Sequence, residues 1–244
     1  YWAFQALVPP EQSGIDVIID AALSEKGLAA NPPASREQLI RRAYFDLIGL
    51  APTYSQIREF AGDKAPVAEA FARLVDRLLA MPEYGERWGR HWLDVVRYAQ
   101  TNGYERDDEK PNAWRYRDYV VDAFNSDKPY DRLVLEQLAG DELADGGDEG
   151  LIATGFYRLG VFDDEPDDKR AAEFDGLDDM LRTTSETFLG LTTGCARCHD
   201  HMFDPISQVD YYEMAAFFRN VRQYQKPQRG KEGAVLRQVK GGMA

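Results

Sequence analysis

Residues 190–201 read Gly-Leu-Thr-Thr-Gly-Cys-Ala-Arg-Cys-His-Asp-His, and this stretch contains both cysteines of the 244-residue chain. The run Cys195-Ala-Arg-Cys198-His199 has the Cys-x-x-Cys-His spacing of c-type haem attachment. In that chemistry the two thiols add to the two vinyl groups on one edge of the porphyrin, and two intervening residues match their separation. The adjacent His199 can then offer a ring nitrogen to the iron. The motif predicts one covalent haem c, with His199 as the proximal iron ligand.

Three other interpretations of the two cysteines stay open from sequence. Half of a zinc site would need two further ligands, and His91 and His201 are the only other histidines. A thioredoxin-like redox pair is expected beside a strand–helix–strand unit, but the sequence has no alternating strand pattern of useful length. The third is a chance spacing of two inert thiols. Two cysteines are too few for a disulfide scaffold or a four-cysteine zinc site.

The rest of the chain has the apolar periodicity of helices, so we expect an all-α protein. Capping boxes at Ser35–Gln38 and Thr53–Gln56 predict two helix starts, and Asp175 is a candidate N-cap further on. The other predicted helices span 66–80, 84–100, 112–125, about 133–138, 177–189 and about 210–221. We expect one multi-helix domain over residues 1–224, wrapping one c-type haem with non-globin connectivity. Residues 225–244 are expected to form a tail or a linker to a removed downstream domain.

The composition restricts the partners. Asp and Glu outnumber Lys and Arg by 42 to 29, which gives a net charge of −13. We expect such a chain to repel nucleic acid and anionic membranes and to attract cationic partners; a surface charged for solubility or salt tolerance is the alternative. No apolar run reaches the roughly 18–20 residues of a membrane span. We therefore expect no nucleic-acid binding and no membrane insertion by this segment.

The residues around the motif resemble a known family. Residues 190–212, from Gly190 to Tyr212, are similar to the haem segment of the planctomycete-type cytochrome domain of unknown function, found in large exported proteins. Met202 stands where that resemblance leads us to expect lysine. Further similarity lies in residues 1–5, 41–50, 84–94, 129–132 and 136–141. The resemblance implies a helical haem domain from a longer protein that often carries a second cytochrome module.

These observations lead to one favoured function and two alternatives. We expect an exported mono-haem c-type cytochrome domain, periplasmic or at the cell surface, that transfers electrons within a larger protein. Its redox partner would be a second cytochrome module of the same parent. The first alternative is a haem peroxidase or oxidase that acts on an extracellular substrate such as carbohydrate. The second is a structural module fastened by haem. The start at Tyr1, without methionine, fits a piece of a longer chain.

The ligand on the other side of the iron would separate these functions. His91 is our first candidate distal ligand, because it shares a helical stripe with Trp88, Trp92 and Val95 and should face an apolar interior. A core histidine hydrogen-bonded to a carboxylate or carbonyl is the alternative. His201 lies too close to His199 to reach the opposite face, so we expect it to support the site from behind.

Other distal ligands and haem contacts stay open. Thioether or phenolate ligation could come from several residues, and the position could also be empty. We predict that Trp88 and Arg115 contact the haem, with the arginine on a propionate; a solvated helix face is the alternative for Arg115. The candidate thioethers and phenols are Met180, Met202, Met214, Tyr98, Tyr104, Tyr116 and Tyr119.

Two weaker expectations concern acidic residues. Asp94 and Arg97 are spaced as an i, i+3 helical ion pair. Asp200, Asp204 and Asp210 could gather around calcium, although their spacing is not that of an EF-hand loop. The sequence contains no phosphate-binding loop and no His-Glu-x-x-His motif, so nucleotide-dependent and zinc-protease chemistry have no support.

Overall fold

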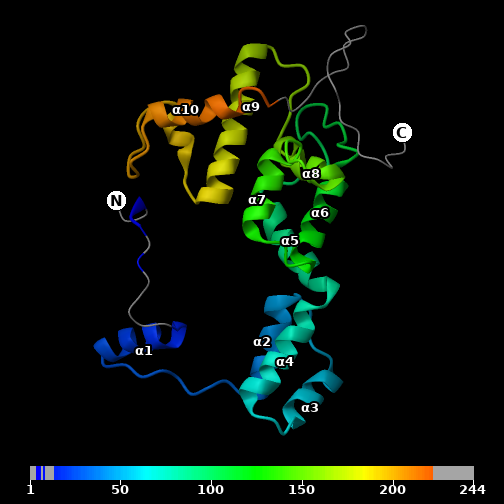
Figure 1. Cartoon of the computed structure of the whole chain (residues 1–244), viewed down its shortest axis with the longest axis vertical. Helices are drawn as coiled ribbons and strands as arrows, with labels where there is room; N and C mark the ends of the chain where they lie inside the picture. Colours follow the sequence, from blue (N-terminus) through cyan, green and yellow to red (C-terminus); the bar gives the residue numbers. More distant parts are fainter. Residues whose placement is uncertain (1–3, 7, 9–13, 222–244) are drawn as a thin grey trace.

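The structure is a computed structural model that describes residues 4–6, 8 and 14–221 (Figure 1). Within these residues there are helices and no strands, and the only strand-like feature is an isolated bridge between Thr101 and Glu109. The prediction of an all-α fold is confirmed. The α-helices are α1 (Ile15–Glu25), α2 (Arg36–Leu47), α3 (Tyr54–Gly62), α4 (Val67–Leu79), α5 (Pro82–Val95), α6 (Ala113–Asn125), α7 (Tyr130–Ala139), α8 (Gly147–Ala153), α9 (Lys169–Thr184) and α10 (Gln208–Phe218).

Three short turns complete the helical elements. The 3₁₀ helix η2 (Thr154–Arg158) follows α8, the π-helix η3 (Ser185–Leu189) continues α9, and the 3₁₀ helix η4 (Thr193–Arg197) contains the first cysteine. No described helix is both long enough and apolar enough to pass through a bilayer.

The two predicted capping boxes are present. The amide of Gln38 donates to Ser35 Oγ at 3.3 Å, while the amide of Ser35 donates to Gln38 Oε1 at 2.9 Å. Thr53 and Gln56 repeat this exchange at the start of α3. Each box satisfies backbone donors that the first helical turn leaves free. A third box, which we did not predict, pairs Ser207 with Asp210 and starts α10.

The apolar residues form two cores. The first core lies among α2, α3 and α4 and includes Ile40, Leu74 and Leu78. The second core extends from α5 to α10. Tyr84, at the start of α5, packs against the first core, and its ring lies 6.5 Å from that of Phe124, which packs against the second. That residues 1–224 form one domain stays a prediction, and the predicted tail, 225–244, lies outside the described residues.

Two glycines allow α5 and α6 to pack closely. A Cβ atom added to Gly85 would lie 2.4 Å from the Val121 carbonyl oxygen, and one added to Gly89 would lie 3.2 Å from Val121 Cγ2. Asn125, at the end of α6, accepts from the Gly85 amide at 2.8 Å and donates to the Pro82 carbonyl at 3.2 Å. The close packing places the Gly85–Gly89 face of α5 against α6.

Two predicted helix boundaries were wrong. The helix expected over 84–100 ends at Val95, because Arg97 takes a left-handed conformation with φ +56°. The helix expected over 177–189 begins at Lys169, because Asp168 caps it by accepting from the Arg170 and Ala171 amides. Asp175 is therefore not an N-cap. Helices α1 and α8 were not predicted.

Candidate functional site

The two cysteines lie on one tight turn of the chain. The Cys198 amide donates to the Cys195 carbonyl at 3.3 Å, which continues the 3₁₀ turn of η4. In a 3₁₀ helix, residues three apart project from the same side. Both cysteines are exposed, and neither forms a disulfide. Ala196, which lies between them, is fully buried in the second core. The turn presents Cys195 and Cys198 together on the surface and anchors itself by Ala196.

The segment before the cysteines is fixed by buried hydroxyl groups. Thr193 Oγ1 donates to Ser185 Oγ at 3.1 Å, and Ser185 Oγ donates to the Leu181 carbonyl at 2.8 Å. The chain reverses direction at Gly190, whose φ of +65° is readily adopted by glycine. The π-helical turn at 185–189 is of a kind often found beside functional sites. These contacts hold η4 against the end of α9.

Arg197, between the cysteines, ties the turn to α9 and α10. Its Nη2 atom lies 2.7 Å from Asp175 and its Nη1 atom 3.4 Å from Asp178, both on α9. Its carbonyl accepts from Gln208 Nε2 and from the Tyr212 hydroxyl, both at 3.1 Å and both from α10. The backbone and side chain of Arg197 therefore hold the motif between two helices.

His199 is exposed and already has one ring nitrogen in use. Its Nδ1 atom lies 2.8 Å from the carbonyl oxygen of Asp200, and a carbonyl can only accept, so Nδ1 carries the proton. The lone pair of Nε2 is then available. A metal-bound histidine usually donates its other N–H group to a carbonyl or carboxylate in this way. The hydrogen bonding of His199 fits the predicted role of iron ligand.

His201 is different, because its side chain is buried, with 7% exposed. Its Nδ1 atom accepts from the Asp204 amide at 2.8 Å and from the Phe203 amide at 3.3 Å. Nε2 lies 3.4 Å from Thr192 Oγ1. The His201 ring is therefore hydrogen-bonded to the backbone of its own loop.

Each of the three aspartates considered for calcium has a different partner within the protein. Asp200 Oδ1 accepts from the Gln208 amide at 2.8 Å, Asp210 belongs to the capping box of α10, and Asp204 Oδ2 lies 3.5 Å from His201 Nδ1. In residues 4–6, 8 and 14–221, no three His, Cys, Asp or Glu side chains are grouped to hold a metal ion. The geometry gives calcium no support.

The cysteine turn stands among exposed apolar side chains. Phe203 exposes 82% of its surface, and Met202 beside it is similarly open. Contiguous exposed apolar side chains mark binding surfaces for a ligand or a partner more often than isolated ones do. The other exposed apolar residues of this part of the chain are Leu189, Val209, Tyr212 and Phe217.

All of the predicted stripe on α5 except Trp92 faces outward, which corrects our expectation of a buried His91. His91 is exposed and its ring lies edge-on to Trp88, with 5.6 Å between ring centroids. Trp88 and Val95 are exposed as well. Trp92 turns inward, where its Nε1 donates to Gln137 Oε1 at 3.2 Å. His91 as distal ligand stays a prediction, now as an imidazole open to solvent.

α5 nevertheless lies close to the cysteine segment. The ring of Trp92 is 5.9 Å from that of Phe188 in η3, a few residues before Cys195. The exposed residues Trp88, His91 and Val95 follow one another on the neighbouring face of the same helix. The structure therefore brings the helix that carries His91 against the segment leading to the motif.

The remaining candidates fall into distinct environments. Arg115, half-buried at the start of α6, stacks over Trp114 at 4.9 Å, and no described carboxylate pairs with it. Tyr116 and Tyr119 are buried, and burial raises the pKa of each phenol far above its usual value, which disfavours the phenolate form. Met180 is buried, and Met214 lies 3.7 Å from Ser185 Oγ. Tyr98 accepts from Gln100, and Tyr104 is exposed.

Arg97 pairs with Asp179, not with Asp94 as the sequence suggested. Its guanidinium contacts both carboxylate oxygens, with Nε at 2.8 Å from Oδ1, and stacks over Phe156. Lys110 lies nearby and donates to the carbonyls of Leu159 and Gly160 at 3.0 and 2.6 Å. Burial, followed by the charge of Arg97, lowers the pKa of Lys110 to about 8. No local sequence signal points to this cluster, because its members meet only in the folded chain.

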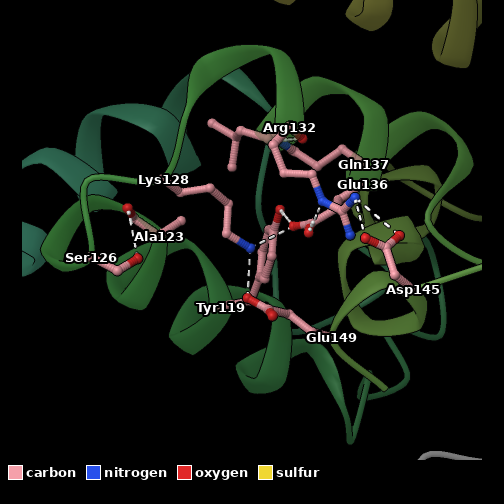
Figure 2. Close-up of polar contacts among 10 residues, drawn as sticks. Tyr119, Ala123, Ser126, Lys128, Arg132, Glu136, Gln137, Asp145 and Glu149 are labelled. Atoms are coloured by element: carbon pink, nitrogen blue, oxygen red, sulfur yellow. Dashed lines mark hydrogen bonds and ion pairs between the residues drawn. The ribbon is translucent and has the colours of Figure 1, made fainter. Parts of the chain in front are cut away.

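A buried carboxylate joins α6, α7 and α8, and Figure 2 shows its partners. Glu136 is 3% exposed and accepts from Lys128 Nζ at 2.5 Å, Arg132 Nε at 2.7 Å and the Tyr119 hydroxyl at 2.9 Å. Lys128 also contacts Glu149 at 2.6 Å, and Arg132 contacts Asp145 at 3.0 Å. Both carboxylate oxygens of Glu136 are paired, so we interpret the network as part of the framework behind the site.

Comparison with known proteins identifies a family match. The model of the PSCyt2 family, described as a protein of unknown function (DUF1549), matches residues 14–223 and so includes the cysteine turn and α5. No curated protein and no solved structure matches the chain.

Proposed function

This chain belongs to the PSCyt2 family of proteins of unknown function, and we propose that it is an exported electron-transfer domain that carries one haem c on Cys195 and Cys198. The observation that supports this most strongly is the 3₁₀ turn itself. It exposes two reduced thiols on one side and places an exposed imidazole directly after them. Each thiol would add its sulfur and its hydrogen across one vinyl group, so that no atom is lost.

His199 would bind the iron through Nε2. Its Nδ1–H group already donates to the Asp200 carbonyl, so the ring needs no change of tautomer to offer the Nε2 lone pair. When bound, haem supplies one-electron chemistry through the ferric and ferrous states of its iron. On the protein side, the exposed apolar residues beside the turn would cover the porphyrin and lower its contact with water.

The other predicted contacts come from α5 and α6. His91 is the candidate sixth ligand, since it is exposed on the helix that contacts η3 and has no described hydrogen-bond partner. Trp88, edge-on to it, would contact the porphyrin. Arg115, which has no described carboxylate partner, would hold a propionate. These three residues are proposals and require the loaded protein for their test.

The exposed position of the turn favours electron transfer as the function. A group attached at Cys195 and Cys198 would lie at the surface, where a redox partner can approach it. The net charge of −13 favours a partner with a basic surface. A second cytochrome module of the same parent protein would meet this condition only if its contact surface is basic. Covalent attachment implies an exported protein, in the periplasm or at the cell surface.

One observation favours a second function. Because His91 is open to solvent and no described residue holds it, the iron could keep a free sixth position with His91 as a nearby base. A haem peroxidase or oxidase needs such a position. The two functions differ in whether small ligands bind the iron.

The test is expression of the chain with a cytochrome c maturation system. We expect covalent haem on a denaturing gel, lost when Cys195→Ser and Cys198→Ser are combined. Low-spin spectra that do not change with cyanide or carbon monoxide, but do change in His91→Ala, would support the electron carrier. High-spin spectra that respond to both ligands would favour the enzyme. Wild-type protein without covalent haem would refute both.

A further inference from the structure

The loop that follows His199 is closed by His201. The His201 amide donates to the Ile206 carbonyl at 2.8 Å, and the Ile206 amide donates to the Asp204 carbonyl at 2.8 Å. Inside this ring of backbone, His201 Nδ1 accepts from the amides of Phe203 and Asp204. The buried imidazole thus supplies an acceptor to two backbone N–H groups of the loop.

The same loop holds the carbonyl that orients His199. Asp200 lies between the two histidines, and its carboxylate accepts from the Gln208 amide at the start of α10. Its carbonyl oxygen, 2.8 Å from His199 Nδ1, belongs to the peptide bond that leads into His201. That peptide is therefore held on one side by α10 and on the other by the closed 201–206 loop. Its orientation decides where the His199 ring can point.

We propose that His201 is a positioning residue for His199: its Nδ1 closes the 201–206 loop, which holds the Asp200 carbonyl against His199 Nδ1. The role of His201 within the loop concerns the folded chain without haem. Its effect on iron binding by His199 rests on the proposed function. Direct ligation by His201 is a poor fit. Its Nδ1 already accepts two backbone N–H groups, and its ring is buried.

Two near-isosteric variants separate a positioning role from a merely structural one. His201→Asn places its amide oxygen close to the position of Nδ1 and keeps an acceptor for Phe203 and Asp204. His201→Gln moves the acceptor one methylene further out, and His201→Ala removes it. The chain has three histidines, so their ring signals are readily assigned by single substitutions.

The first readout uses the chain without haem. In long-range ¹H–¹⁵N spectra we expect His199 to show the Nδ1–H tautomer in the wild type and in His201→Asn. We expect that signature to be lost in His201→Ala and weakened in His201→Gln. Amide exchange at Asp204 should rise about fivefold in His201→Ala, because one hydrogen bond worth about 1 kcal/mol is removed, and should stay near the wild-type rate in His201→Asn.

The second readout uses the haem-loaded protein. We expect a changed low-spin spectrum and reduction potential in His201→Ala, with rescue in His201→Asn. If His201→Ala keeps the His199 tautomer, or if His201→Asn behaves like His201→Ala in both preparations, the proposal is overturned. If no preparation binds haem, the proposed function fails, while the tautomer and exchange data still decide the role of His201.

Discussion

Removing the buried carboxylate of Glu136 should destabilise the framework behind the site by about 3 kcal/mol. Glu136→Ala deletes the group that accepts from Lys128, Arg132 and Tyr119. The two cations keep other partners, Glu149 at 2.6 Å and Asp145 at 3.0 Å. The Tyr119 hydroxyl, on a residue that is 5% exposed, keeps none among the described residues.

These contacts decide the magnitude. Breaking a buried pair by removing one partner costs about 3–5 kcal/mol when the remaining charge is left alone. Here both charges retain a carboxylate, which favours the lower end of that range. The orphaned Tyr119 hydroxyl contributes about 1–3 kcal/mol of it. The matched control is Glu149→Ala, because Glu149 contacts the same lysine but is 58% exposed, and such a rim contact is worth less than about 1 kcal/mol.

The assay is urea unfolding followed by tryptophan fluorescence. Three of the four tryptophans, Trp88, Trp92 and Trp114, lie on α5 and α6, so the signal reports mainly these two helices. We expect the free energy of unfolding to fall about three times as far in Glu136→Ala as in the control. Equal losses of unfolding free energy in Glu136→Ala and Glu149→Ala would refute this reasoning. They would mean that the buried carboxylate of Glu136 contributes no more to stability than the exposed one of Glu149.

Other predictions follow from single contacts. Burial alone would raise the pKa of Glu136, but hydrogen bonds from Lys128, Arg132 and Tyr119 hold it below 4.5. Glu136 therefore stabilises the fold above pH 4.5 and loses this contribution as the pH falls, so acid titration of stability should be shallower in Glu136→Gln. Gly85→Ala should cost about 1–3 kcal/mol in urea unfolding, because its Cβ would meet the Val121 carbonyl at 2.4 Å. Asp127→Gly should raise the free energy of unfolding by about 0.5–1 kcal/mol, because exposed Asp127, two residues after the end of α6, has a φ of +50° that glycine adopts without strain; no gain would contradict this.

Local signals in the sequence were enough to predict much of the fold. The capping boxes at Ser35 and Thr53 act within four residues, and both are present. Apolar periodicity located most of the helices because a packed helix must bury one stripe. The 3₁₀ turn could not be predicted from the cysteine spacing, since it depends on Ala196 entering a core made by distant helices.

The inward face of α5 was mispredicted for a physical reason. We followed the large side chains, Trp88, His91 and Val95, and expected them inside. The buried face instead runs through Gly85, Gly89 and Val96, where the absence of side chains lets α6 approach. Glycine carries no apolar signal, so the periodicity pointed to the neighbouring face.

Contacts between residues far apart in the sequence could not be predicted either. Arg97 ends α5 in a left-handed conformation, and its partner Asp179 lies 82 residues later. The sequence offered only Asp94, three residues earlier. His201 could be assigned a supporting role because of its short distance from His199, but its backbone partners depend on the closed loop.

Haem staining of a denaturing gel, together with the visible spectrum of the same sample, tests the central claim most directly. The chain is expressed with a cytochrome c maturation system, beside the combined Cys195→Ser and Cys198→Ser variant. We predict a haem-stained band at the mass of the chain, a Soret band in solution, and loss of the stained band in the variant. Wild-type protein that folds but shows neither signal would contradict the assignment of Cys195, Cys198 and His199 to haem.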